Sequence, residues 1–200
     1  NDSLKFAVLT GCLRVAKESI FTGLNNFKVC SITDSDFDEA FGFTDSEVKS
    51  ILQYYGQETH YTEVKEWYDG YRFEKASSIY SPRSVVAAMT SGICDSYWNQ
   101  TETFEALRGY IDMNFDGLKD DVLSMMAGEM VPVNTGSFSN DMTTFHGEDD
   151  VLTLLIHLGY LGYDFSHKSV FIPNNEIRGE FVNAVSVSHW GEVSLSLIHI

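Results

Sequence analysis

The stretch DDVLTLLIHLGYLGYDFSHKSVFIPNNEIRGEF, Asp149 to Phe181, decides the fold class. It predicts a largely apolar helix that ends at Gly159, then two β-prone runs around the polar turn Ser166-His167, then a second helix. These elements are expected at Asp149–Leu158, Tyr160–Phe165, Ser169–Ile172 and Pro173–Val185. The succession of helix, hairpin and helix resembles a winged-helix-like unit, or alternatively a compact lid, within a helix-rich α+β fold.

Cap signals predict a series of helices before this unit. Thr44-Asp45-Ser46-Glu47 is a capping box, so a helix is expected over Asp45–Tyr55, with Gly56 ending it. Ser81-Pro82 places an N-cap residue before a proline at the first helical position. Further helices are expected at Thr62–Tyr68, Pro82–Met89, Thr103–Met113 and Leu118–Met126. Met130–Asn134 is strand-like, and its Pro132 cannot donate a ladder hydrogen bond, which predicts an edge strand.

The chain begins with a β-prone, mostly apolar run, Lys5–Thr10, as expected of a buried central strand. Arg14 and Lys17 follow directly, although the chain carries 13 Lys and Arg against 29 Asp and Glu. The net charge of -16 argues against binding to a phosphate backbone by this segment alone. Since no preceding element pairs with the strand, we expect Asn1–Phe27 to be the least well-packed region.

The sequence contains no complete nucleotide site. A phosphate-binding loop ends in Gly-Lys-Ser/Thr, and the 200 residues contain no Gly-Lys dipeptide. The Asp38-Glu39 pair does not follow an apolar strand, as magnesium-binding acids should. Two Glu-x-Lys triplets, Glu47-Val48-Lys49 and Glu63-Val64-Lys65, resemble part of a nuclease site, but they fall in predicted helices, where residues i and i+2 point in different directions.

Other residue patterns exclude further classes of site. The six histidines form no i, i+4 metal-ligand pair, so we expect no metal site, and His157 is expected to be a packed or half-buried residue of its helix. Cys12, Cys30 and Cys94 have no disulfide or zinc spacing, which suits a reducing cytoplasm. The longest apolar run, Val151–Tyr163, is too short to span a bilayer, so no membrane contact is expected.

The densest aromatic cluster is KEWYDGYRF, Lys65–Phe73, around the Asp69-Gly70 turn. We interpret it as a packed corner in which Asp69 bonds its own turn, with a ligand-contact role as the alternative.

The stretches LKFAVLTGCLRVAKESIFTGLNN, KEWYDGYRF, SIYSPRSVV, SYWNQT, LLIHLGYLGYD and FIPNNEIRGEF occur in the order seen in the AAA-ATPase-like family. The chain resembles that family from Leu4 to about Val193. Its members are bacterial P-loop proteins that often carry a C-terminal nuclease-like domain of the PD-(D/E)XK type. Each motif is weak alone, and their fixed order makes the resemblance specific.

The resemblance implies that Lys5–Thr10 is the sheet strand that faces the γ-phosphate. Thr10 would then be the sensor residue that orients the attacking water, and Arg14 and Lys17 would stabilise charge during phosphoryl transfer. The alternative, that both cations are ordinary surface residues, stays open. The family's phosphate loop and magnesium-binding acids belong upstream of Asn1, so ATP and magnesium are expected for the full-length protein and none for this segment, which we expect to be inactive alone.

The predicted organisation has four parts: 1–30 as the end of a P-loop ATPase core, 31–150 as a helical lid region, 151–194 as the winged-helix-like unit, and 195–200. The last six residues, LSLIHI, match the translation of a sequencing-library adapter, with an ordinary amphipathic tail as the alternative. Two functions remain: part of an ATP-hydrolysing protein, or a protein-interaction module of a degenerate ATPase. Nucleic acid would be contacted through a downstream nuclease-like domain.

Overall fold

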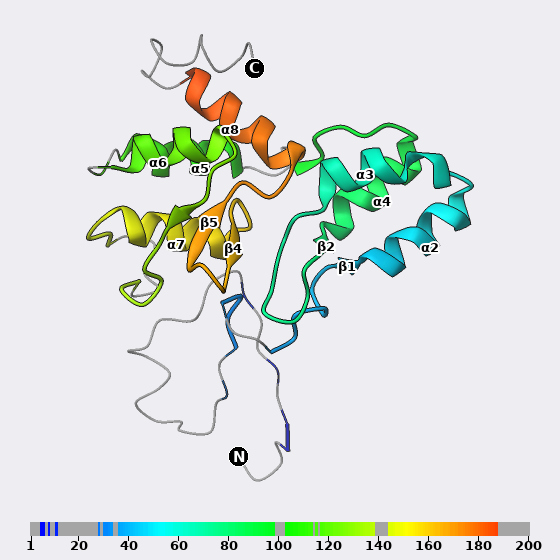
Figure 1. Cartoon of the computed structure of the whole chain (residues 1–200), viewed down its shortest axis with the longest axis horizontal. Helices are drawn as coiled ribbons and strands as arrows, with labels where there is room; N and C mark the ends of the chain where they lie inside the picture. Colours follow the sequence, from blue (N-terminus) through cyan, green and yellow to red (C-terminus); the bar gives the residue numbers. More distant parts are fainter. Residues whose placement is uncertain are drawn as a thin grey trace.

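The computed structural model describes residues 5, 6, 8, 11, 28, 30–33, 36–98, 103–113, 115, 117–138 and 144–187. In this part of the chain, helices alternate with two small antiparallel sheets, which is the helix-rich α+β fold that the sequence predicts (Figure 1). None of the helices described is both long and apolar enough to cross a membrane.

In the first half of the described chain, α2 has its predicted caps, whereas Ser81 precedes Pro82 at the start of α4 without a side-chain cap hydrogen bond. Its elements are β1 (Phe43–Thr44), α2 (Asp45–Tyr55), the 3₁₀ helix η1 (Glu58–His60), α3 (Tyr61–Tyr68), β2 (Ile79–Tyr80) and α4 (Pro82–Ser91). The Thr44 hydroxyl accepts from the Glu47 N–H, and the Glu47 carboxylate accepts from the Thr44 N–H at 2.8 Å, which confirms the capping box. Gly56 ends α2 with a φ of +66°, the left-handed conformation that favours glycine. Strand β1 pairs with β2 in antiparallel register.

The second half contains the predicted helix–hairpin–helix unit. Its elements are α5 (Thr103–Asp112), α6 (Leu118–Met126), β3 (Val131–Pro132), α7 (Glu148–His157), β4 (Gly162–Asp164), β5 (Ser169–Phe171) and α8 (Asn175–Val187). The sheet order is β3-β5-β4, with Val131 opposite Val170. Pro132 therefore lies in an edge strand, as predicted.

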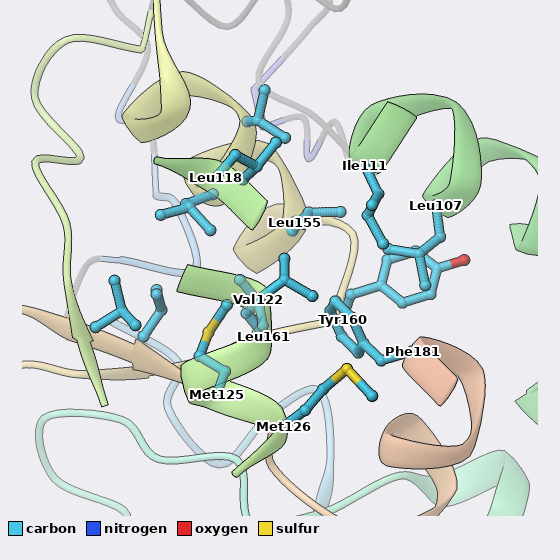
Figure 2. Packing of buried hydrophobic residues seen from close by; sticks show 14 of the residues in the cluster. Leu107, Ile111, Leu118, Val122, Met125, Met126, Leu155, Tyr160, Leu161 and Phe181 are labelled. Atoms are coloured by element: carbon cyan, nitrogen blue, oxygen red, sulfur yellow. The ribbon is translucent and has the colours of Figure 1, made fainter. Parts of the chain in front are cut away.

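Two hydrophobic cores organise these elements. The N-terminal core consists of buried side chains of α2, α3, β2 and α4: Val48, Leu52, Val64, Tyr68, Tyr80, Val85, Ala88 and Met89. The C-terminal core is larger and is built by α5, α6, α7, α8 and the three-stranded sheet. Figure 2 shows part of it, with Leu107 and Ile111 of α5 near Tyr160 and Phe181. Helix α8 packs against both α5 and α3, so it lies between the two groups of helices (Figure 1).

The C-terminal core contains residues from both sides of position 150. We expected a lid region to end and a winged-helix-like unit to begin at that position. Helices α5 and α6 bury Leu107, Ile111 and Val122 against Leu155 of α7 and Phe181 of α8. The hydrophobic core therefore divides near Tyr97 and Trp98, because Tyr97 packs against the N-terminal core and Trp98 against the C-terminal one. The four-part organisation itself stays a prediction. Of the predicted buried strand Lys5–Thr10, the structure describes Lys5, Phe6 and Val8. These three residues are exposed and belong to no strand, so the prediction of a buried strand is wrong for them.

Candidate functional site

The residues that the family resemblance assigns to the nucleotide site, Thr10, Arg14 and Lys17, lie outside the described residues. Their roles stay predictions. The structure does describe side chains of the other five stretches that carry the resemblance, and these side chains meet between the two cores.

The Asp69-Gly70 turn provides the first side of this meeting place. Asp69 is 8% exposed, and its Oδ2 accepts from the Ser78 hydroxyl at 2.8 Å. Gly70 has a φ of +119° and packs so closely on Pro173 that a β-carbon would overlap the Pro173 carbonyl group. The turn therefore requires glycine for its conformation and for the close approach of the chain that leads into α8.

Two tyrosines of KEWYDGYRF anchor the same turn. The Tyr68 hydroxyl donates to the Asp95 carbonyl at 2.9 Å, and the Tyr71 hydroxyl donates to the Gly159 carbonyl at 2.7 Å. Burial raises the pKa of both phenols well above the ordinary value. These contacts confirm the packed-corner interpretation for the tyrosines. The prediction for Asp69 is wrong in its partner, which is Ser78 rather than the backbone of its own turn.

Helix α8 provides the other side, because it has two buried faces of different chemistry. Ile177, Phe181, Ala184 and Val185 belong to the C-terminal core. Glu176 and Glu180 lie one turn apart and are each 1% exposed. A buried carboxylate is costly unless it is hydrogen-bonded, so the partners of these two side chains define the site.

Glu176 connects α8 to two segments of the N-terminal half. Its Oε2 accepts from the Ser84 hydroxyl of α4 at 2.8 Å. Its Oε1 accepts from two successive backbone N–H groups, at 2.8 Å from Tyr97 and 3.1 Å from Trp98. Burial raises the pKa of Glu176, against the lowering effect of these three hydrogen bonds. Glu176 thus holds the peptide at which the chain passes from one core to the other.

Glu180 makes one side-chain contact across the same boundary. Its Oε1 accepts from the Ser96 hydroxyl at 2.9 Å. Its Oε2 is buried, and no donor in the described residues reaches it. The charge of Glu180 also contributes to the raised pKa of Glu176, since two carboxylates on one helix face repel each other.

We call this boundary the polar seam and define it by the side chains of Asp69, Ser84, Ser96, Asn174, Glu176 and Glu180. Asn174 accepts from the Ile177 N–H at 3.0 Å and so closes the first turn of α8. The seam is buried apart from Ser96, which is half-buried. Each of the five described stretches contributes to the boundary, LLIHLGYLGYD through the Gly159 carbonyl that Tyr71 binds.

The sequence did not reveal the role of Glu176 and Glu180, because charged residues at i and i+4 usually mark a solvated helix face. The available signal was their spacing relative to Ile177 and Phe181. The two acids directly precede two large apolar residues that lie in the core, a pattern that is compatible with burial of the acids and that an ordinary amphipathic helix also shows.

The hydrogen bonds of the seam hold segments of the chain together. Its carboxylates accept hydrogen bonds from fixed donors, and no group of three or more His, Cys, Asp or Glu side chains in the described part could hold a metal ion. The Glu-x-Lys triplets lie in α2 and α3, as predicted. Glu47 serves the capping box, and Lys49 pairs with Asp45. His157 is half-buried and stacks on Phe138 with ring centroids 5.8 Å apart, in agreement with its predicted packing role.

An open groove lies along α2 on the outer side of the N-terminal core. It has a volume of about 370 Å³ and is lined by Phe43, Ser46, Glu47, Ser50 and Ile51. Two exposed aromatic side chains lie near it in sequence, Phe41 at 78% and Tyr54 at 86% exposure. The groove is thus a partly apolar surface with a single carboxylate, which is already engaged in the capping box.

Comparison with known proteins gives one informative relative. A stretch of 100 residues is 28% identical to an uncharacterized protein in the vnfD 5′ region of Azotobacter chroococcum mcd 1. The match covers 50% of this chain and 19% of the relative, so the matched stretch is about a fifth of that protein's length. No family model matches the chain, and the search of solved structures found no match.

Proposed function

We propose that this chain is part of a larger AAA-type P-loop ATPase, without its phosphate-binding loop and magnesium-binding acids, and that the whole protein binds and hydrolyses ATP with magnesium. The observation that carries the proposal is the ordered set of stretches typical of the AAA-ATPase-like family. Five of these stretches meet at the polar seam, which gives them a structural role in the described part of the chain. In this proposal the described residues serve architecture, and the phosphate-binding loop belongs to a different part of the protein.

Thr10, Arg14 and Lys17 carry the chemical part of the proposal. Thr10 orients the attacking water, and the two cations stabilise charge that develops on the phosphoryl group. In the longer protein, the substitutions Thr10→Ala, Arg14→Ala and Lys17→Ala should reduce turnover more than nucleotide affinity, since the interactions strengthen in the transition state. Unchanged turnover in all three variants would show that these residues have no catalytic role and are ordinary surface residues.

Isothermal titration tests directly whether the main nucleotide-binding groups lie outside this chain. Most nucleotide affinity in P-loop proteins comes from loop N–H groups, the loop lysine and magnesium. The 200-residue chain should therefore show no tight binding of Mg-ATP. Micromolar binding by this chain alone would overturn the assignment.

A second candidate is a protein-interaction module of a degenerate ATPase, with the groove along α2 as the contact surface. The exposed Phe41 and Tyr54 near this groove favour it. The coding sequence upstream of Asn1 discriminates the two candidates. A glycine-rich loop ending in Gly-Lys-Ser/Thr and an apolar strand ending in Asp-Glu favour the ATPase, and their absence favours the interaction module.

A further inference from the structure

The two cores are each closed by apolar packing, whereas the boundary between them is polar. Val48, Val64 and Val85 are fully buried within the N-terminal core, and Leu107, Leu155 and Phe181 within the C-terminal core. The boundary instead contains buried carboxylates, hydroxyl groups and backbone N–H groups. The two halves are also joined by the close Gly70–Pro173 contact, by the Tyr71–Gly159 hydrogen bond, and by Arg72, which pairs with Asp164 at 3.7 Å and lies over the Phe171 ring. Separation at the boundary would therefore return water to polar groups and leave both cores intact.

The chain passes this boundary at two adjacent residues that belong to different cores. Tyr97 packs against the N-terminal core, and Trp98 packs against the C-terminal one, with its ring edge-on to Tyr160 at 5.8 Å between centroids. Both N–H groups are held by one carboxylate oxygen of Glu176. A single side chain of α8 therefore fixes the orientation of the connecting peptide.

The second carboxylate of α8 weakens the closed arrangement. Glu180 has one oxygen that no donor of the described chain reaches, and it lies close enough to raise the pKa of Glu176. Two buried carboxylates one helical turn apart regain solvation when the boundary opens, which offsets part of the lost hydrogen bonding. The half-buried Ser96 places the Glu180 end of the seam nearest to solvent.

We propose that the polar seam is a reversible joint at which the N-terminal core separates from the C-terminal core as an intact body, with Glu176 as the latch on the Tyr97–Trp98 peptide. Tyr68, Tyr71 and Glu180 each interact electrostatically with Glu176, and the hydroxyls of the two tyrosines donate to the Asp95 and Gly159 carbonyls. The joint does not depend on nucleotide binding, so the test of the joint is independent of the test of the ATPase proposal.

Residue-resolved hydrogen exchange of the 200-residue chain tests the joint. After correction for intrinsic rates, the Tyr97 and Trp98 amides should be protected at least tenfold less than those of Met89 and Leu155 in the two cores, with a weaker dependence on urea, since joint opening exposes less surface than global unfolding. Equal protection and equal urea dependence at the seam and in both cores would overturn the proposal.

Variants separate joint opening from simple loop motion. Glu176→Ala should accelerate exchange at Tyr97 and Trp98 by about ten- to a hundredfold, while Met89 and Leu155 remain the better-protected amides. Glu176→Gln should have a smaller effect, because its amide oxygen still accepts from both N–H groups. Glu180→Gln, which removes the repelling charge without touching either amide, should slow their exchange. The exposed Glu129→Gln is the matched control. Unchanged or faster exchange in Glu180→Gln, or no effect of Glu176→Ala, would contradict the latch.

Discussion

The C-terminal core and the polar seam are both buried, yet they depend on different physics. In the C-terminal core, side chains such as Leu107, Leu155 and Phe181 gain stability from removal of apolar surface and from close packing. At the seam, three hydrogen bonds to the Glu176 carboxylate offset the free energy that its burial costs in lost solvation. Core substitutions should therefore cost free energy through cavities, and seam substitutions through unsatisfied partners and altered backbone fit.

The largest expected effect is in the C-terminal core. Phe181→Ala should lower the free energy of unfolding by about 3–5 kcal/mol, because the fully buried ring leaves a cavity among α5, α7 and α8. Urea unfolding followed by circular dichroism measures this change. The control is Phe41→Ala, at a side chain that is 78% exposed, which should change stability by less than about 0.5 kcal/mol. Similar losses in the two variants would remove the distinction between core and surface.

The next effect is a backbone effect at the edge of the seam. Gly70→Ala should destabilise the protein by about 2–4 kcal/mol, because a β-carbon would be strained at a φ of +119° and would overlap the Pro173 carbonyl. Gly92→Ala is the matched control, since Gly92 has a φ of +73° and open space around it. That variant should lose about 1–2 kcal/mol from the left-handed conformation alone. Thermal unfolding of both variants measures the two losses of stability. Equal losses in Gly70→Ala and Gly92→Ala would show that Gly70 makes no close contact that excludes a β-carbon.

Most of the helices could be predicted because their signals are local. The capping box at Thr44 and Glu47, the proline at the start of α4 and the glycine after α2 each act within one turn. The edge position of Pro132 followed from the missing N–H group.

The seam could not be predicted in the same way, because its partners are far apart in sequence. Ser84 and Glu176 are separated by 92 positions, and nothing local distinguishes a buried Glu on α8 from a solvated one. The apolar residues that directly follow the two acids are compatible with burial but do not require it. The same limit applies to the C-terminal core, because tertiary packing joins α5 and α6 to segments on the other side of residue 150 and no local signal marks that contact.

A smaller effect is expected within the N-terminal half, where a carboxylate is bonded but partly solvated. Asp45 accepts from the hydroxyls of Tyr61 and Tyr80 and pairs with Lys49, and these contacts, led by Lys49, lower its pKa to about 2. Because the folded-state pKa lies below the unfolded value, the stabilisation is fully present above pH 3.8 and is lost as the pH falls through about 2.

Asp45→Asn should therefore lower the free energy of unfolding at pH 7 by on the order of 1 kcal/mol after solvent screening, and the difference from wild type should vanish near pH 2. Urea unfolding across this pH range measures it. Asp112→Asn, at the exposed Arg108 pair, should have little effect at any pH. A difference that persists unchanged at pH 2 would show that the Asp45 contacts do not depend on its charge.

The most direct test of the seam is a double-mutant cycle between Ser84 of α4 and Glu176 of α8. Urea unfolding of wild type, Ser84→Ala, Glu176→Ala and the double variant isolates the energy of the contact that joins the two cores at 2.8 Å. We predict a coupling energy of about 1 kcal/mol or more, because the hydroxyl donates to a buried carboxylate. Additive losses, with a coupling below about 0.3 kcal/mol, would show that the two residues do not interact and would contradict a seam held by Glu176.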